Sequence, residues 1–346
     1  MNRQKFGYGI ALLVFGFFYV VLGGQSNVCI DDDGDGYSVS TCGSECGPVD
    51  CDDTNPDVNP GAFEGPGGDS TCSDGHDNDC DGAIDVDDLG CFGSEMTSIP
   101  AGEFIMGSDP GEGHADEEPE HVVTLSAYDI DVYEVTNAEF AEFLNAYGSN
   151  NSPEGLEMLD ADDMDRHIFF DVDSWVAEAG YEDHPVIEVT WYGANTFCEY
   201  FGKRLPTEAE WEKAARGGCE VGGDPGDCED PDDERTYPWG EGIDCGRANY
   251  SGCVEDTMPV GSYPDGVSPY GVHDMAGNVW EWVADKYHSG YYSISPPEDP
   301  TGPVTGLYRN LRGGSWAVTT TILRIANRNY SSPVDSNFND GFRCAR

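Results

Sequence analysis

The C-terminal part of the chain, from residue 217 onward, contains no long segment with the periodicity of a helix or a strand. Glycine, proline, aspartate and aromatic residues dominate it, and the whole chain has 45 glycines and 21 prolines. Glycine and proline mark turns rather than regular elements. A domain of this kind is held by turns, disulfides and buried contacts between arginine and carboxylate groups. The sequence therefore predicts a loop-rich α+β domain over residues 95–346.

Regular elements are legible only before residue 217. Residues 99–108 alternate like a strand that enters a turn, and residues 122–133 read as a second strand region. Thr136 precedes Glu139, and Thr207 precedes Glu210, at the spacing of a capping box. Together with a cap at Thr190 and closing glycines, these signals predict three short helices: from Thr136 to about Ala146, from Thr190 to Gly202, and from Thr207 to Gly217.

The first 24 residues are typical of a secretory signal. Arg3 and Lys5 form its charged start, residues 10–22 its apolar run and residues 21–24 a cleavage region of small residues. A retained membrane anchor is the alternative, but the run is short for a bilayer span, which needs about 20 residues. We expect cleavage, no transmembrane span afterwards, and a secreted, periplasmic or cell-surface protein.

The charge of the chain excludes one class of partner. It has 67 acidic residues against 16 lysines and arginines, a net charge of −51, and no lysine or arginine between Lys5 and Arg166. Nucleic-acid binding needs basic groups that neutralise phosphates, so no nucleic-acid partner is expected. Repulsion on this scale destabilises a compact state unless cations screen it, and calcium is the cation expected outside the cell. Thirteen cysteines in an exported chain indicate disulfides.

Residues 29–91 form a separate acidic, cysteine-rich segment. Asp31, Asp33 and Asp35 alternate before a glycine, as in the first half of an EF-hand calcium loop, but position 12 of that loop is Cys42 rather than glutamate. The aspartate-rich order resembles the metal-binding repeats of secreted bacterial proteins and thrombospondin type 3 calcium repeats. Seven cysteines and few aliphatic residues favour a unit held by calcium and disulfides over a solvated acidic linker. Zinc is not expected, because the segment has a single histidine.

Five ordered motifs run through the main domain. They are GKRLPTEAEWE at 202–212, YPWG at 237–240, AGNVWEW at 276–282, RGGSW at 312–316 and GFRC at 341–344. In this order they resemble the formylglycine-generating enzyme (sulfatase-modifying factor) family. The resemblance implies a variant C-type-lectin-like fold with little regular secondary structure, in agreement with the loop-rich α+β prediction.

The resemblance also implies a pattern of disulfides. A family disulfide would join Cys198 to Cys344. A second family disulfide would join the positions now held by Ala215 and Ile325, so that both of its partners are absent together. Two short loops rich in acidic residues or glycine are expected to be closed by local bridges, Cys219–Cys228 and Cys245–Cys253.

Two calcium sites follow from the resemblance. The first would use the side chains of Asp274 and Glu281 and the carbonyl groups of Gly277 and Val279. All of these ligands are oxygens, as calcium requires. The second would use the side chain of Asn249 and the carbonyl of Tyr250, and its remaining ligand stays open between Glu255 and Asp256. A turn that only packs aromatic residues is the alternative for residues 278–281.

The catalytic signal of the family is missing. Ser315 and Trp316 would line its substrate groove, and a copper-binding cysteine pair would follow them, but no cysteine occurs between Cys253 and Cys344. Copper(I) prefers soft thiolate ligands, so copper is not expected. The hydroxyls of residues 319–321 would need an adjacent base to act as nucleophiles. Arg324, Arg328 and Arg343 are read as partners of buried carboxylates, with an anion-binding cluster as the alternative.

Several functions remain open on this sequence. The first is an exported family member without cysteine oxidation, a calcium-stabilised binding or accessory domain with a peptide, glycan or small-molecule ligand. The alternative is an oxidoreductase of the same family that acts on a protein or small-molecule thiol through another metal. An iron-dependent sulfoxide synthase is disfavoured, because its helical three-histidine domain is absent and His114 and His121 lie in an acidic loop. A calcium-dependent adhesion protein, with the acidic segment as its stalk, is the last option.

Overall fold

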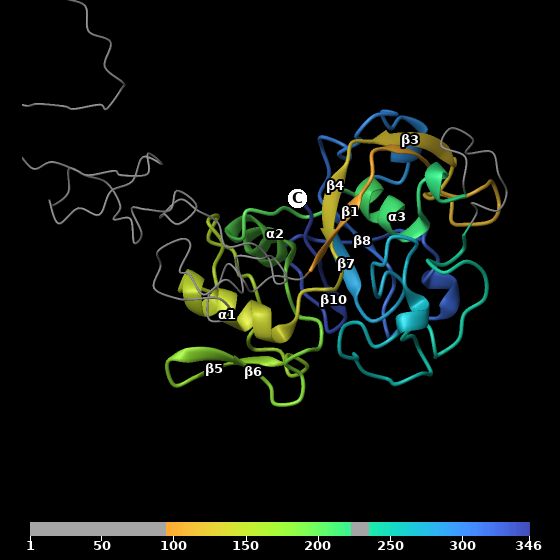
Figure 1. Ribbon diagram of the computed structural model, residues 1–346. Coiled ribbons are helices and arrows are strands. Elements are labelled where there is room, and N and C mark those ends of the chain that lie inside the picture. Colours follow the sequence, from red (N-terminus) through yellow and green to blue (C-terminus); the bar gives the residue numbers. More distant parts are fainter. Residues whose placement is uncertain (1–94, 223–234) are drawn as a thin grey trace, which may run out of the picture. The chain divides into compact units, whose positions relative to one another are not determined.

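The computed structural model describes residues 95–222 and 235–346, which all belong to one compact unit (Figure 1). The expected signal (1–24), the acidic segment (29–91) with Asp31, Asp33 and Asp35, and Cys228 lie outside the described residues. Within the two described ranges, no helix is long and apolar enough to cross a membrane.

Four strands form the N-terminal part of the described domain. β1 (Met96–Ile99) pairs antiparallel with β4 (Tyr128–Asp131), and β2 (Gly102–Met106) pairs antiparallel with β3 (His121–Leu125). Each of the two predicted strand regions is therefore divided into two strands. The first division falls at Pro100, which has no N–H to donate to a ladder. Phe104 and Met106 alternate inward along β2 while Glu103 faces solvent, as a half-buried strand requires.

The three predicted helices are confirmed. α1 (Asn137–Tyr147) and α3 (Glu208–Arg216) both begin at complete capping boxes, on Thr136 with Glu139 and on Thr207 with Glu210. α2 (Trp191–Tyr200) begins at Thr190, whose side chain accepts a hydrogen bond from the N–H of Gly193. The local signals sufficed because each cap satisfies N–H groups that have no partner within the helix.

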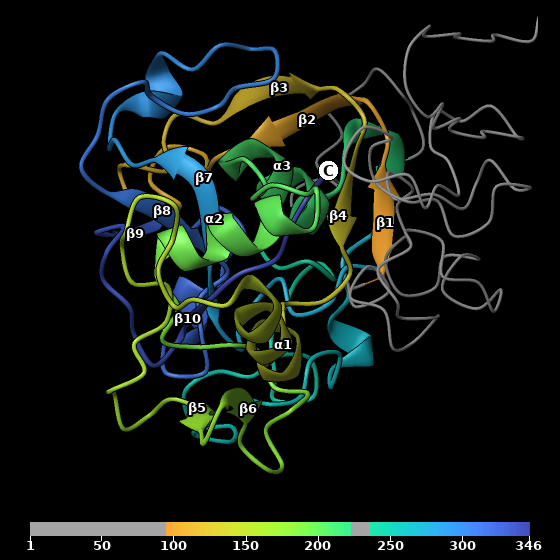
Figure 2. The ribbon, with the colours of Figure 1, turned by 90° about the vertical axis from the view of Figure 1, so that its left-hand side faces the viewer.

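A mixed four-stranded sheet lies against these helices, in the order β10 (Asp340–Gly341), β7 (Trp280–Lys286), β8 (Arg309–Arg312) and β9 (Asn329–Ser331). β10 is parallel to β7, and the other neighbours are antiparallel. Both α2 and α3 contact β7, and Figure 2 shows them in front of the sheet. The hairpin of β5 (Ile168–Asp171) and β6 (Ser174–Ala177) packs beside α1 (Figure 1).

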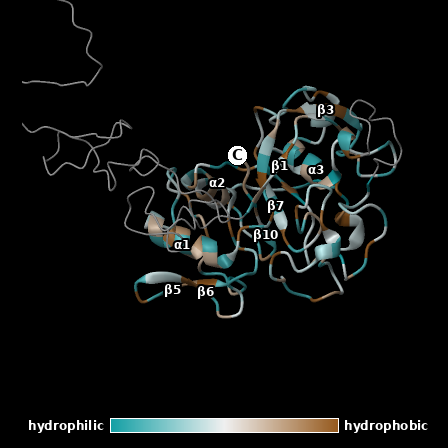
Figure 3. Ribbon diagram, viewed as in Figure 1, coloured by the Kyte–Doolittle hydropathy of each residue, from teal (hydrophilic) through white to brown (hydrophobic). Residues whose placement is uncertain are grey.

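Aromatic residues dominate the larger core cluster, which joins α1 and α2 to the sheet. Phe140, Phe143, Phe197 and Phe342 contact one another with ring centroids 5.3–6.0 Å apart. The disulfide between Cys198 and Cys344 lies in the same cluster, and both cysteines are fully buried. Figure 3 shows hydrophobic and hydrophilic residues mixed along α1 and α3. The mixture fits a helix that buries one face in α1, whereas in α3 all nine residues are buried and most of the polar ones form ion pairs.

Buried ion pairs hold the rest of the interior together. Arg312 lies 2.9 Å from Glu208 and 2.6 Å from Glu212, and Arg328 lies 2.7 Å from Glu208. Lys203 pairs with Asp131 at 2.8 Å. The predicted arginine–carboxylate contacts are therefore present in the described residues, and they connect α3 to β8 and to the segment that precedes β9.

Candidate functional site

The segment from Asp274 to Glu281 forms a tight turn that leads into β7. Asp274, Gly277 and Asn278 have φ values of +58°, +99° and +60°. A Cβ atom on residue 277 would lie 2.3 Å from the carbonyl oxygen of Asn249, so only glycine fits there. The N–H of Asn278 donates to the carbonyl of Asn249 at 3.0 Å, and the N–H of Trp316 donates to the carbonyl of Asn278 at 2.8 Å. The turn therefore connects both expected calcium segments to the expected groove.

Three buried carboxylates meet at this turn. Asp274 and Glu281 were predicted from the sequence, and Glu134, which follows β4, joins them. The side-chain amide of Asn278 donates to Glu134 at 2.7 Å, and the N–H of Gly261 donates to Asp274 at 2.7 Å. One guanidinium balances the cluster, because both oxygens of Glu281 accept from Arg343 at 2.7 and 2.8 Å.

The charges of this carboxylate cluster are not neutralised by that guanidinium alone. Burial raises the pKa of Glu134 well above its usual range, and the charges of Asp274 and Glu281 raise it further. Burial also raises the pKa of Asp274 to about 6. A hard divalent cation would offset this repulsion, and oxygens are the ligands that calcium prefers. Glu134 and Asp274 therefore fit a calcium ion better than Glu281, whose oxygens already bind Arg343 and the indole of Trp211.

The second expected site is built on Asn249. Its side-chain N–H group donates to the carbonyl of Asp256 at 2.7 Å, while its buried Oδ1 has no hydrogen-bond partner. A buried oxygen without a donor is costly unless something else binds it, and a cation would do so. Asp256 is half-buried and accepts from Tyr181 at 2.7 Å, whereas Glu255 is exposed. The carbonyl of Tyr250 accepts from the N–H of Cys253 at 3.0 Å.

The expected groove residues differ in their accessibility. Ser315 is fully buried, and its hydroxyl accepts from the side chain of Asn339 at 2.8 Å. Trp316 is partly exposed, and its ring lies 5.5 Å from that of Phe338. The indole N–H of Trp316 is buried without an acceptor. Only Trp316 therefore faces the surface at this position.

Apolar side chains and threonines occupy residues 317–323, where the family's cysteine pair was expected. Leu323 is fully buried and belongs to a small cluster with Tyr237, and Val318 packs against that cluster. The hydroxyls of Thr319 and Thr321 lie 3.2 Å apart at the surface. Within the described ranges, no histidine forms a hydrogen bond with these hydroxyls.

The three arginines read as carboxylate partners have that role in the described residues. Arg343 binds Glu281 and Arg328 binds Glu208, and all four side chains are buried. Arg324 binds the fully buried Glu117 through both of its terminal nitrogens, each at 2.7 Å. An anion-binding cluster of all three is therefore not present, although Arg324 also lines a cavity.

One of the two predicted local disulfides closes the loop that carries Asn249 and Tyr250. Cys245 and Cys253 are bonded across a loop of eight residues. Cys219 is also disulfide-bonded, and its expected partner Cys228 lies outside the described residues. Ala215 and Ile325, which occupy the positions expected for the second family disulfide, are both fully buried and carry no thiol.

Two groups of acidic residues were missed by sequence reasoning. Glu134 gave no signal, because it lies just outside the capping box of α1 and about 140 residues from its partners. Asp160, Asp163 and Glu188 place carboxylate oxygens within 4.8 Å of one another, a spacing that could hold a cation. Burial raises the pKa of Glu188 to about 7, and the charge of Asp163 contributes. Only long-range packing brings these residues together.

Comparison with known proteins gives one consistent result. Residues 91–346 match the family model described as "Sulfatase-modifying factor enzyme 1-like domain". The formylglycine-generating enzyme of Streptomyces coelicolor is 37% identical over 290 residues, which cover 71% of this chain and 87% of that protein. The serine/threonine-protein kinase pkn1 of Chlamydia pneumoniae is 44% identical over 255 residues, 73% of this chain and 38% of the kinase. The chain thus spans about two fifths of that relative.

A solved structure supports the fold. PvdO from Pseudomonas aeruginosa is 30% identical, with a TM-score of 0.56 over 73% of this chain and 94% of that chain. The predicted loop-rich α+β architecture, a variant C-type-lectin-like fold, is confirmed by this likeness and by the short sheets and few helices of the described residues.

Proposed function

Because the chain belongs to the sulfatase-modifying factor (formylglycine-generating enzyme) family, we propose that it is an exported, calcium-stabilised member that binds a ligand and does not oxidise cysteine. The observation that carries the proposal concerns the segment that follows Trp316 in the sequence, where Val318 and Leu323 pack in a small apolar cluster. A copper centre of the family type would need thiolates in that segment, and residues 254–343 contain none.

Calcium is proposed to stabilise the scaffold. Glu134, Asp274 and Glu281 bring three carboxylates to one guanidinium, and the buried Oδ1 of Asn249 has no donor. Two sites are proposed on this basis, with Glu134 and Asp274 in the first and Asn249 with Asp256 in the second. Further calcium in the acidic segment at 29–91 is proposed from its Asp-x-Asp-x-Asp pattern alone.

The calcium proposal is tested by metal analysis and thermal unfolding of the full chain. Saturating calcium should raise the melting temperature, since a ligand that binds only the folded state at 100 times its Kd adds about 2.7 kcal/mol. Glu134→Gln should bind about one calcium fewer. Glu103→Gln, a surface carboxylate on β2, is the matched control and should bind the normal number. Equal calcium in both variants would remove Glu134 from the site.

The loss of oxidation is tested by oxygen uptake. The purified chain, supplied with copper or with iron, is mixed with a cysteine-containing peptide, and the expected rate equals that of a blank without protein. Uptake above the blank would favour the alternative, a thiol oxidoreductase of this family that works through another metal. The proposed partner of the non-oxidising member is a peptide, glycan or small molecule outside the cell.

A further inference from the structure

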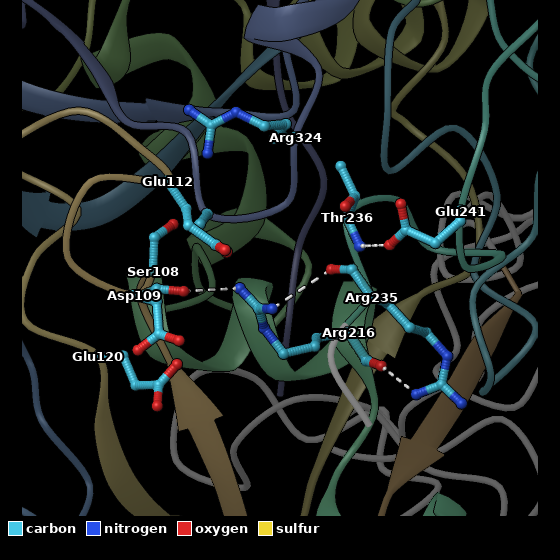
Figure 4. Close-up of a pocket in the computed structure, with 11 residues that line it drawn as sticks. Ser108, Asp109, Glu112, Glu120, Arg216, Arg235, Thr236, Glu241 and Arg324 are labelled. Atoms are coloured by element: carbon cyan, nitrogen blue, oxygen red, sulfur yellow. Dashed lines mark hydrogen bonds between the residues drawn. The ribbon is translucent and has the colours of Figure 1, made fainter. Parts of the chain in front are cut away.

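The hairpin of β5 and β6 has two outer edges, and the described residues bind only one of them. The hairpin lies at the rim of the described domain, with β6 in contact with α1 (Figures 1 and 2). Neither strand contains a proposed calcium ligand or Ser315 and Trp316, and neither lines the cavity at Arg216 and Arg324 (Figure 4). The hairpin is therefore separate from the calcium sites and from the segment that lacks the cysteine pair.

The register of the hairpin shows which backbone groups point outward. Just beyond the two strands, the N–H of Glu178 donates to the carbonyl of His167 at 2.7 Å. In an antiparallel pair, hydrogen-bonded positions alternate with positions whose N–H and C=O groups point away from the partner strand. Counted from that bond, Phe170 and Trp175 lie opposite each other at a position without ladder bonds. The backbone groups of these two residues therefore point out of the hairpin, on opposite sides.

Only one of these two edges has hydrogen-bond partners in the described domain. The N–H of Trp175 donates to Oδ1 of Asn145 at 2.6 Å, and its carbonyl accepts from Nδ2 of Asn145 at 2.9 Å. One side chain of α1 thus closes the edge of β6, as a neighbouring strand would. No hydrogen bond from residues 95–222 or 235–346 reaches the N–H or carbonyl of Phe170. The edge of β5 is therefore open, and an open edge is a template for another strand.

Apolar side chains flank the open edge. The exposed fractions of Met164, Phe170 and Val172 are 93%, 59% and 91%. Val172 is the first residue of the two-residue turn, and its φ of +55° is in the left-handed region. A branched side chain is unfavourable there, and turns of this length favour asparagine or glycine. Neither the strain nor the exposure helps the hairpin to fold, and both are typical of a surface that contacts another molecule.

Acidic side chains surround the same edge. Residues 160–178 contain seven aspartates and glutamates and a single lysine or arginine, Arg166. Asp171 at the end of β5 and Asp173 in the turn are both exposed. The guanidinium of Arg166 lies over the ring of Phe169, 4.9 Å from its centroid. A segment that pairs with this edge is therefore favoured when it carries positive charge.

Neither a second copy nor another part of this chain supplies that charge. A second copy would place the same aspartates opposite one another, and each copy has a net charge of −51. Residues 1–94 contain only Arg3 and Lys5, both within the expected signal, and residues 223–234 contain no basic residue. The complementary charge comes from a different protein.

We propose that β5 binds an extended segment of another protein, in which apolar residues alternate with lysine or arginine. The segment adds a strand to the hairpin, and its backbone bonds to the N–H and carbonyl of Phe170. Neighbouring strands align the side chains that share a face. The apolar residues of the segment therefore lie beside Phe170, and its basic residues lie beside Asp171.

Fluorescence anisotropy of labelled peptides, titrated with the full chain at physiological salt, tests the proposal. The probe is Thr-Lys-Val-Lys-Val-Lys-Thr. One control, Lys-Lys-Lys-Thr-Val-Val-Thr, keeps the charge without the alternation, and Thr-Glu-Val-Glu-Val-Glu-Thr keeps the alternation with the opposite charge. The probe should bind at least tenfold more tightly than either control. Absence of binding by the probe, or equal binding by a control, would overturn the proposal.

Methylation of the peptide backbone separates strand pairing from attraction between charges. N-methylation removes an N–H group, and alternate residues of a strand direct their N–H groups to the same edge. Two versions of the probe are compared, one methylated at both valines and the other at two of the lysines. One version should lose at least tenfold in affinity and the other should keep its affinity. Equal affinities of the two versions would contradict pairing with β5.

Phe170→Pro identifies the edge within the protein. It removes the outward N–H, which takes no part in the ladder with β6. Phe170→Thr is the matched control, because it loses the same ring contact with Trp175 but keeps the N–H. The folded proline variant should bind the probe at least tenfold more weakly than the threonine variant, and equal binding would refute the assignment. A dimer of the unmodified chain that Phe170→Pro abolishes would assign the edge to a second copy and overturn the proposal.

Discussion

Removal of the disulfide between Cys198 and Cys344 should destabilise the domain more than removal of the one between Cys245 and Cys253. The first closes a loop of 146 residues and the second a loop of eight. Chain entropy links the two losses to loop length, because a longer closed loop removes more conformations from the unfolded state. The two bridges therefore form an internal comparison within one chain.

The magnitudes follow from the loop lengths. The chain-entropy relation gives about 5 kcal/mol at 25 °C for the long loop and about 2.5 kcal/mol for the short one. Burial also makes the expected loss larger for the long-loop bridge, since Cys198 and Cys344 are fully buried whereas Cys245 is exposed. A loss of about 5 kcal/mol is a large part of the 5–15 kcal/mol by which native proteins are stable. The long bridge is thus expected to decide whether the domain is folded at all.

Urea unfolding of the two double alanine variants measures the difference. Cys198→Ala with Cys344→Ala should lower the free energy of unfolding by about 2.5 kcal/mol more than Cys245→Ala with Cys253→Ala. If the long-loop variant is already unfolded without urea, the measured loss is a lower limit and agrees with the expectation. Equal losses, or a larger loss for the short loop, would show that loop entropy does not govern these bridges.

Three further predictions concern buried groups. Lys203→Met leaves Asp131 buried without its partner and should lower the free energy of unfolding by about 3–5 kcal/mol. In urea unfolding, the double variant with Asp131→Asn should regain part of that loss. No recovery would argue against the buried charge as the cause. Gly277→Ala, which places a Cβ 2.3 Å from Asn249, should lower the melting temperature more than Gly242→Ala, where φ is also positive but the space is open; equal shifts would rule out the close contact. Burial raises the pKa of Asp285 from 3.8 to about 8, so its folded form binds a proton more tightly than its unfolded form, and stability present below pH 4 is lost as the pH rises to 8. Asp285→Asn should flatten the pH dependence of the unfolding free energy over that range by up to about 6 kcal/mol, and an unchanged slope would show that Asp285 does not cause it.

The parts of the fold that sequence predicted are the parts fixed by neighbouring residues. Capping boxes at Thr136 and Thr207 satisfy N–H groups within one helical turn, so their signal is complete over four residues. The two strand regions were found for the same reason. Their division into β1 with β2 and β3 with β4 was not found, because it depends on which strands pair, and the paired residues are 15–35 positions apart in the chain.

The candidate site shows the limit of the same reasoning. Asp274 and Glu281 share one motif, and the motif pointed to both. Glu134 lies about 140 residues earlier, and it reaches them only through its hydrogen bonds with Asn278 and Val279 in the folded domain. A single sequence does not show which distant positions meet in the fold, so the charge balance of this carboxylate cluster could not be predicted from it.

The scaffold is stabilised by groups that lie outside residues 317–323. The long disulfide, the pairs of Arg312 and Arg343, and the turn at Gly277 all connect other segments. Residues 317–323 are held by the apolar packing of Leu323 and Val318 and by hydrogen bonds to their backbone carbonyls from Ser251 and Tyr237, and none of these contacts needs a thiol. None of these supports of the fold therefore depends on a thiol in this segment. The scaffold can therefore keep its shape for the proposed binding role without the chemistry of a cysteine pair.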